Sequence, residues 1–108
     1  MNRAFAEVTD TTLGTVIEIE PCGASAAVYF SGPSQWVIDG CFYTVWGIIG
    51  SLIVPLTMPT ALSLSTTQPE VSLVHGIGGC DSVFVTINGP LPSVPTKPLK
   101  IAIATWGS

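Results

Sequence analysis

The sequence predicts an all-β domain, a small antiparallel β-sandwich or barrel, on three observations. Val, Ile and Thr are abundant, and their β-branched side chains favour strands because they pack well on a pleated surface. The 11 Gly and 9 Pro are spread along the chain, which leaves no room for a long helix. Short apolar runs recur at intervals of roughly 8–12 residues, the spacing typical of sandwiches and barrels. The 108 residues correspond to one domain.

Two segments of the chain are predicted to be extended without being regular core strands. Residues 1–13 have weak helical character at best, so we expect an N-terminal arm with at most one helical turn near residues 4–8. Residues 14–108 then form the single β domain. Within it, residues 90–98 hold four prolines, which predicts an extended, polyproline-like segment.

Alternation of apolar and polar residues predicts the strands of the domain. In Gly14–Glu20, Ile17 and Ile19 face one way and Glu18 faces the other, as in a half-buried strand. Pro21 ends this run. Further strands are predicted over residues 25–31, 60–65, 71–75, 82–87 and 99–106.

A tight hairpin is predicted in the middle of the chain. Asp39-Gly40 separates the strand-like runs 35–38 and 41–46, and Asp-Gly suits a two-residue turn whose central residues need positive φ. Residues 48–54 are predicted to continue as a second buried segment or as a bent extension, with a bulge allowed at Gly47 or Gly50.

A membrane span is the alternative for the uncharged stretch between Gly40 and Pro69. Residues 41–61 have the length to cross a bilayer. Glycine and proline interrupt them, strand-forming residues dominate them, and the flanking charges are acidic, whereas spans are oriented by Lys and Arg. Two buried strands are therefore favoured over a span. The first residues also lack the features of a secretory signal.

Charge and cysteine content exclude several classes of partner. The formal net charge is −4, and Arg3, Lys97 and Lys100 are the only Lys or Arg residues. Nucleic-acid binding by counterion release needs many more cations. The three cysteines, an odd count without CxxC spacing, predict free, buried thiols with neither a disulfide framework nor a zinc site. We expect no metal and no cofactor.

One loop carries the residue types of a nucleophilic site. A His75–Cys80 pair, with Asp81 beside it, could activate a thiolate near glycine amides. A glycine turn whose Asp81 bonds local amides explains the same residues. Phosphate-binding motifs are absent from the sequence. The sequence therefore predicts no enzyme and no catalytic residues.

Carboxylates and aromatic residues support an alternative function, a small carbohydrate-binding, lectin-like module. Glu18 and Glu20 share one strand face; a solvated face explains them, and cation binding with Glu7 or Asp10 is left open. Aromatic rings can stack on sugars, although in small β domains they more often lie in a core or an interface. The candidates are Trp36, Trp46, Trp106, Tyr29 and Tyr43.

The low charge predicts that much of the surface is buried against other chains. Only 9% of residues are charged, which protects a monomer poorly against association. We therefore expect a structural assembly subunit, a virion protein such as a phage capsid decoration (cement) protein. It would be made in the host cytoplasm, form a homo-oligomer such as a trimer, and dock on a larger shell such as a major capsid protein.

The two extended segments are the predicted contact elements of this assembly. Extended backbone can add to a neighbour's sheet edge, and apolar side chains can anchor in its pockets. The predicted interface residues are Phe5, Val8 and Leu13 in the arm and Pro92, Pro95 and Pro98 in the proline-rich segment. Deleting residues 1–12 is expected to abolish attachment and leave the β core folded.

Overall fold

The computed structural model describes residues 2–8, 14–32, 41–62, 70–77, 79–88 and 99–107, and within them every regular element is a strand. No helix in this described part is long and apolar enough to cross a membrane. The strands are β1 (Asn2–Val8), β2 (Gly14–Ile19), β3 (Ser25–Ser31), β4 (Phe42–Ile49), β5 (Leu52–Pro55), β6 (Thr60–Ala61), β7 (Glu70–His75), β8 (Ser82–Asn88) and β9 (Leu99–Trp106).

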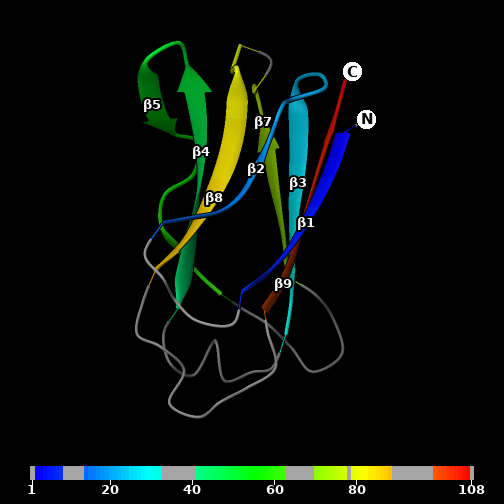
Figure 1. The fold of residues 1–108 in the computed structure, drawn as a ribbon, viewed down its shortest axis with the longest axis vertical. Coiled ribbons are helices and arrows are strands. Elements are labelled where there is room, and N and C mark those ends of the chain that lie inside the picture. The colour runs from blue at the N-terminus through cyan, green and yellow to red at the C-terminus, as the bar shows by residue number, and fades with distance from the viewer. Residues whose placement is uncertain are drawn as a thin grey trace.

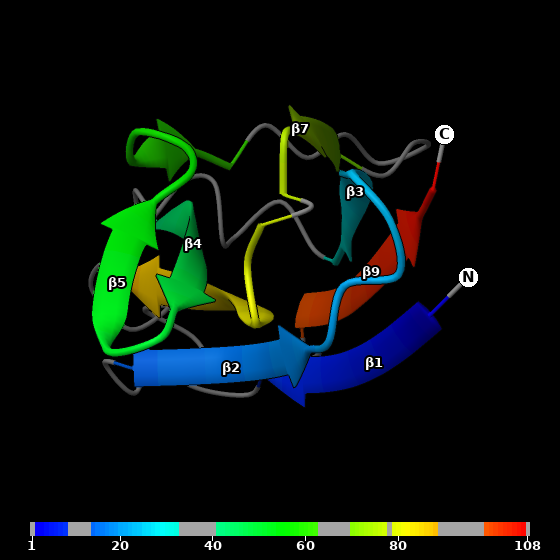
Figure 2. The same cartoon turned by 90° about the horizontal axis from the view of Figure 1, so that it is seen from above.

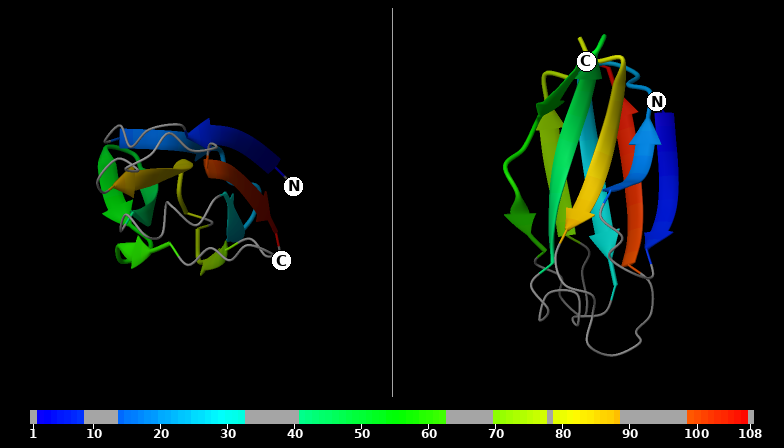
Figure 3. Two further views of the ribbon diagram at one scale, coloured as in Figure 1. Left: turned by 90° about the horizontal axis from the view of Figure 1, so that it is seen from below. Right: turned by 60° about the vertical axis from the view of Figure 1, so that its left-hand side comes forward.

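The strands form two antiparallel sheets packed face to face, which confirms the predicted sandwich (Figure 1 and Figure 2). Sheet A has the order β1-β9-β3-β7. Sheet B follows the path β2-β8-β4-β5, and β6 also pairs with β4. Most neighbouring strands are distant in sequence, so their pairing closes a long loop. The pairing of β1 with β9 brings the two ends of the chain together at one end of the sandwich (Figure 3).

The core lies between the sheets and follows the predicted alternation. Ile17, Ile19, Leu99, Ile101 and Ile103 are all buried, as the sequence predicts. Burial of such aliphatic side chains contributes roughly 1.5–3 kcal/mol each. The core cluster consists of Val8, Ile17, Ile19, Ala26, Val28, Phe30, Cys41, Tyr43, Val45, Leu62, Val74, Ile77, Val83, Val85, Ile87, Leu99, Ile101 and Ile103.

An aromatic pair joins the two layers. The Phe30 ring from sheet A and the Tyr43 ring from sheet B have centroids 4.5 Å apart, a separation at which aromatic pairs add to the energy of burial. Cys41 is also buried. Cys22 and Cys80 are half-buried thiols that form no disulfide with the described residues.

The prediction of a second buried segment over residues 48–54 is wrong. Gly50 adopts φ 61°, which lets the chain reverse after β4, so β5 forms a hairpin with β4 instead of continuing it. Leu52 and Ile53 are exposed, and their strand β5 lies at the end of the sheet B path. The Asp39-Gly40 hairpin lies outside the described residues.

The described part of the predicted N-terminal arm is strand β1 of sheet A. It pairs with β9 from Asn2, opposite Thr105, to Val8, opposite Leu99. The backbone is extended as expected, and the helical turn predicted near residues 4–8 is absent. Ala4 and Ala6 pack against the core. Residues 2–8 therefore belong structurally to the sandwich of their own chain.

Candidate functional site

The exposed large apolar side chains of the described residues gather on two surfaces. Of eight such side chains, four lie on the outer face of sheet A and three on the β4–β5 hairpin. Met58, after β5, is the eighth. The first group is Phe5, Tyr29, Val71 and Leu73, and the second is Ile49, Leu52 and Ile53, which we call the hairpin patch.

Strand register aligns the apolar side chains of sheet A in a row. Phe5 lies opposite Ala102, Ala102 opposite Tyr29, and Tyr29 opposite Val71. The next row places Leu73 at its β7 end, opposite Ala27. The sheet A face, as we define it, comprises Arg3, Phe5, Glu7, Tyr29, Ser31, Val71, Leu73, Lys100 and Ala102.

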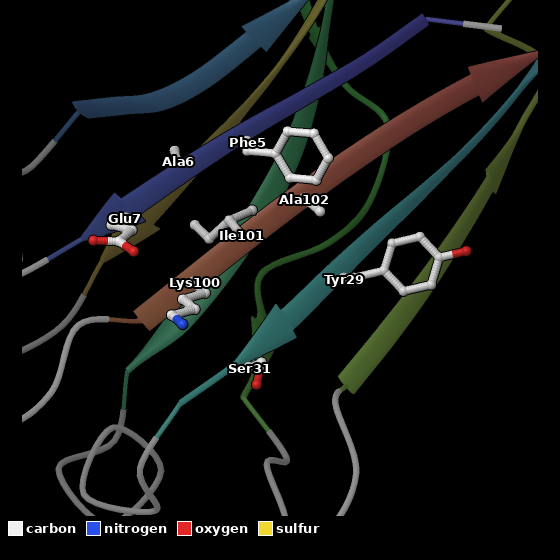
Figure 4. A pocket seen from close by; sticks show the side chains of 8 residues that line it. All are labelled: Phe5, Ala6, Glu7, Tyr29, Ser31, Lys100, Ile101 and Ala102. Atoms are coloured by element: carbon white, nitrogen blue, oxygen red, sulfur yellow. The ribbon is translucent and has the colours of Figure 1, made fainter.

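A shallow hollow of about 340 Å³ lies on this face. The Phe5 and Tyr29 rings stand on either side of the small Ala102 side chain (Figure 4). Since β1 and β3 both pair with β9, the two ring-bearing backbones are separated by two strand spacings, about 10 Å. The hollow is lined by Phe5, Ala6, Glu7, Tyr29, Ser31, Lys100, Ile101 and Ala102.

The hairpin patch lies at the end of sheet B that carries the β4–β5 turn. Ile49 and Leu52 are cross-strand neighbours on one side of the hairpin, and Ile53 lies on the other. The residue before β8 fixes the turn, because the amide of Gly50 donates a hydrogen bond to Oδ2 of Asp81 at 2.7 Å. The amide of Asp81 in turn donates to the carbonyl of Ile48 at 2.6 Å. Two hydrogen bonds with Asp81 therefore fix the turn that presents the apolar side chains of the hairpin.

Charges are divided between the two sheets. The two cations of the described residues, Arg3 and Lys100, both lie on the sheet A face, and Lys100 is the cross-strand neighbour of Glu7. The exposed acids Glu18 and Asp81 lie on the sheet B side, Glu18 on β2 and Asp81 directly before β8. The described part of sheet B carries no Lys or Arg. The outer surfaces of the two sheets therefore differ in charge as well as in shape.

The residues of the predicted nucleophilic loop do not converge. The hydroxyl of Ser25 lies 3.2 Å from Nδ1 of His75, in a hydrogen bond between β3 and β7 of sheet A. Cys80 instead packs against Gly47 of sheet B. Asp81 accepts a hydrogen bond from the amide of Gly50, 31 residues away in the turn between β4 and β5, whereas the glycine-turn interpretation expects a local amide. The described residues include no group of three His, Cys, Asp or Glu side chains arranged to hold a metal ion.

The predicted aromatic platform is dispersed over the fold. Trp46 stacks on Phe84 of the sheet B outer face, with ring centroids 6.1 Å apart, and Tyr43 is in the core. Among the candidates that the structure describes, only Tyr29 lines the hollow. Its partner, Phe5, was predicted only as an arm residue, because nothing in the sequence shows that β1 and β3 flank β9. Trp106 lies at the end of β9, and Trp36 is outside the described residues.

Glu18 on β2 and Glu20, directly after that strand, are surface residues. Glu18 accepts a hydrogen bond from the Ser82 hydroxyl at 2.7 Å, so its described partner is a neighbouring strand. Glu20 is exposed, and its carbonyl accepts from the Asn2 side chain. This is the arrangement of a solvated strand face.

The structure places two of the six predicted interface residues. Phe5 is 76% exposed and lines the hollow, whereas Val8 is 6% exposed in the core of its own chain. The Val8 side chain is therefore not available on the surface of the folded sandwich. Leu13, Pro92, Pro95 and Pro98 lie outside the described residues.

Comparison with known proteins yields structural likeness only. No family model and no curated protein matches the chain. Among solved structures, a chain from infectious bursal disease virus Gt strain aligns with 96% of this chain and 29% of its own length, at 8% identity and a TM-score of 0.39. A carbohydrate-binding module of endoglucanase Cel5A from Eubacterium cellulosolvens aligns with 96% of this chain and 93% of its own length. Its sequence identity is 15% and its TM-score is 0.37. At such low TM-scores neither likeness assigns the chain to a family.

Proposed function

We propose that the protein is a structural assembly subunit, and at a finer level a virion protein such as a phage capsid decoration protein. In this proposal it associates with itself and docks on a larger shell such as a major capsid protein. The observation that carries the proposal is the concentration of exposed apolar side chains on the sheet A face and the hairpin patch.

The energetics of these two surfaces favour burial. Leu52 and Leu73 are each more than half exposed, and covering an aliphatic side chain of this size gains roughly 1.5–3 kcal/mol. Contiguous exposed apolar patches mark interaction sites in folded proteins. With 9% of residues charged, repulsion between copies opposes association only weakly. In this proposal, surfaces of the folded sandwich, rather than a detached arm, therefore supply the contacts between chains.

The virion assignment is tested on particles from the source of the sequence. We expect chymotryptic peptides of this chain in purified particles at a constant ratio to the major shell protein. Re-binding of the purified protein to particles stripped of it should saturate at the same ratio. Leu73→Glu should lower that occupancy, and Met58→Glu, an exposed apolar change outside both surfaces, should leave it unchanged. Absence of the chain from particles would contradict the virion assignment and leave self-association to be judged separately.

A second candidate function, carbohydrate binding, is favoured by the hollow. Phe5 and Tyr29 flank an alanine floor, and Glu7, Lys100 and Ser31 supply polar groups at one end (Figure 4). Small-ligand sites combine apolar or aromatic walls with a few such polar groups. A pyranose ring could lie over Ala102 with its apolar faces against the two rings.

Sugar binding predicts a specific effect of Tyr29→Ala. Affinity electrophoresis in gels that contain soluble polysaccharides should show retardation of the wild-type protein. Tyr29→Ala should weaken that retardation about tenfold in apparent dissociation constant, because an aromatic contact contributes roughly 0.5–1.5 kcal/mol beyond area burial. Val71→Ala, on the same face but outside the hollow, is the matched control. Equal mobility of wild type and Tyr29→Ala in every polysaccharide would contradict this candidate.

A further inference from the structure

We propose that the hollow on the sheet A face receives the β4–β5 hairpin of a second copy of this chain, so that copies join head to tail. This inference rests on the proposed assembly function and names its partner and its contact surfaces. The hollow is the one between Phe5 and Tyr29 over Ala102, and the inserted group is the hairpin patch.

The hollow of one copy is complementary in shape to the hairpin patch of another copy, and not to a second hollow. The hollow is concave, with an apolar floor of Ala102 between two raised rings. The hairpin patch lies at the edge of sheet B, where Leu52 and Ile53, 64% and 60% exposed, point to opposite sides of the edge strand β5. Two hollows facing each other would enclose a void, and voids forfeit packing energy. Interface energy concentrates where an apolar anchor of one partner fills a pocket of the other.

The charges on the two surfaces are complementary. Lys100 lies at the rim of the hollow, and Arg3 lies on the same face. Asp81 lies directly under the hairpin turn, bonded to Gly50, and Glu18 is on the same sheet. The sheet A face carries two cations and one acid, Glu7, whereas the described charges of the sheet B surface are all acidic. Docking the hairpin in the hollow brings these two surfaces together. Such complementarity fixes orientation and speeds encounter.

The position of the two surfaces makes the contact heterologous. The hairpin turn lies at the same end of the sandwich as the two chain ends (Figure 3). The hollow lies on the opposite sheet, and its polar rim of Glu7 and Lys100 pairs at the other end of β1 (Figure 4). Each copy therefore offers one donor and one acceptor surface, and such contacts generate closed rings or open filaments. A ring such as the expected trimer satisfies both surfaces of every copy.

Substitutions on each surface separate this contact from a symmetric one. Leu52→Glu disables the hairpin, and Phe5→Glu disables the hollow. Both side chains are exposed, so we expect both variants to fold, and circular dichroism verifies this. If either variant misfolds, Ile53→Glu replaces Leu52→Glu and Tyr29→Glu replaces Phe5→Glu. Met58→Glu, also exposed but outside both surfaces, is the matched control. Sedimentation velocity is measured on each protein alone and on the equimolar mixture of the two disabled variants.

The expected pattern is specific to a head-to-tail contact. Wild type and Met58→Glu should form oligomers, and each disabled variant alone should be monomeric, with self-association weakened roughly 30-fold or more. The mixture should form a dimer and nothing larger, because Leu52→Glu still offers its hollow and Phe5→Glu still offers its hairpin. Raised salt should weaken this dimer.

Four outcomes would overturn the inference, and they differ in what else they overturn. An oligomeric wild type with no dimer in the mixture means that the contact is symmetric or lies elsewhere, and the assembly function stands. If the Leu52→Glu variant alone still forms oligomers, the contact again lies elsewhere and the assembly function stands. A saccharide that binds the hollow without disturbing the oligomer assigns the hollow to the second candidate function. A wild type that stays monomeric well above micromolar concentration overturns the inference and self-association together.

Discussion

Removal of residues 1–8 is expected to abolish cooperative folding of the sandwich. Strand β1 pairs with β9 along its whole length, and Val8, Ala4 and Ala6 cover part of the core. Losing several ladder hydrogen bonds at about 1 kcal/mol each, together with the burial of Val8, removes a large share of the roughly 5–15 kcal/mol that stabilises a small domain. The truncation would also expose the full edge of β9.

Thermal and urea unfolding followed by circular dichroism test this expectation. The truncated chain should show no cooperative transition, whereas Phe5→Ala, which changes an exposed side chain of the same strand, should unfold within about 1 kcal/mol of wild type. A truncated chain that unfolds at the wild-type midpoint would show that β1 is dispensable. That result would restore the expectation, drawn from the sequence, that the core folds without residues 1–12.

Gly23→Ala is expected to destabilise the protein by about 3 kcal/mol or more. Gly23 has φ 108°, a region that L-residues other than glycine rarely enter. A Cβ at this position would overlap the backbone of Trp106 and Gly107, where the β2–β3 connection crosses the end of β9. Backbone cannot move aside as a flexible side chain can. The hydrogen bond from the Cys22 amide to the buried Thr105 hydroxyl, 2.8 Å, would be displaced with it.

Gly76→Ala is the matched control for this substitution. Gly76 also has positive φ, 80°, but a Cβ there would have no heavy atom within 4 Å. It should therefore cost only the conformational strain, about 1–2 kcal/mol. Urea denaturation gives both free energies of unfolding. Equal losses for the two variants would mean that the contact between Gly23 and the β9 end is looser than described.

The fold class and the buried faces could be predicted from the sequence because they depend on local periodicity. Residues 99–106 alternate, and Leu99, Ile101 and Ile103 are buried as expected. Residues 48–54 are mostly apolar, and such a run does not distinguish a buried strand from a hairpin at the exposed edge of a sheet. The turn at Gly50 decides between the two, and the sequence shows only that a glycine is there.

The candidate site could not be predicted because it depends on strand order. Phe5 and Tyr29 are 24 positions apart in sequence and become neighbours only because β9, from the end of the chain, inserts between their strands. Exposed side chains of single strands carry no signal of which strands flank them. The aromatic residues that the sequence did indicate are divided between the core and both outer faces, so composition alone could not identify the pair that lines the hollow.

The mass of the native particle tests the central claim, self-assembly, most directly. Sedimentation velocity or native mass spectrometry of the wild-type protein, over a dilution series, should show a discrete oligomer at a multiple of the 11.2 kDa chain mass, dissociating only on dilution or at raised salt. A single species of 11.2 kDa at every concentration, with the exposed apolar surfaces still in water, would contradict the account.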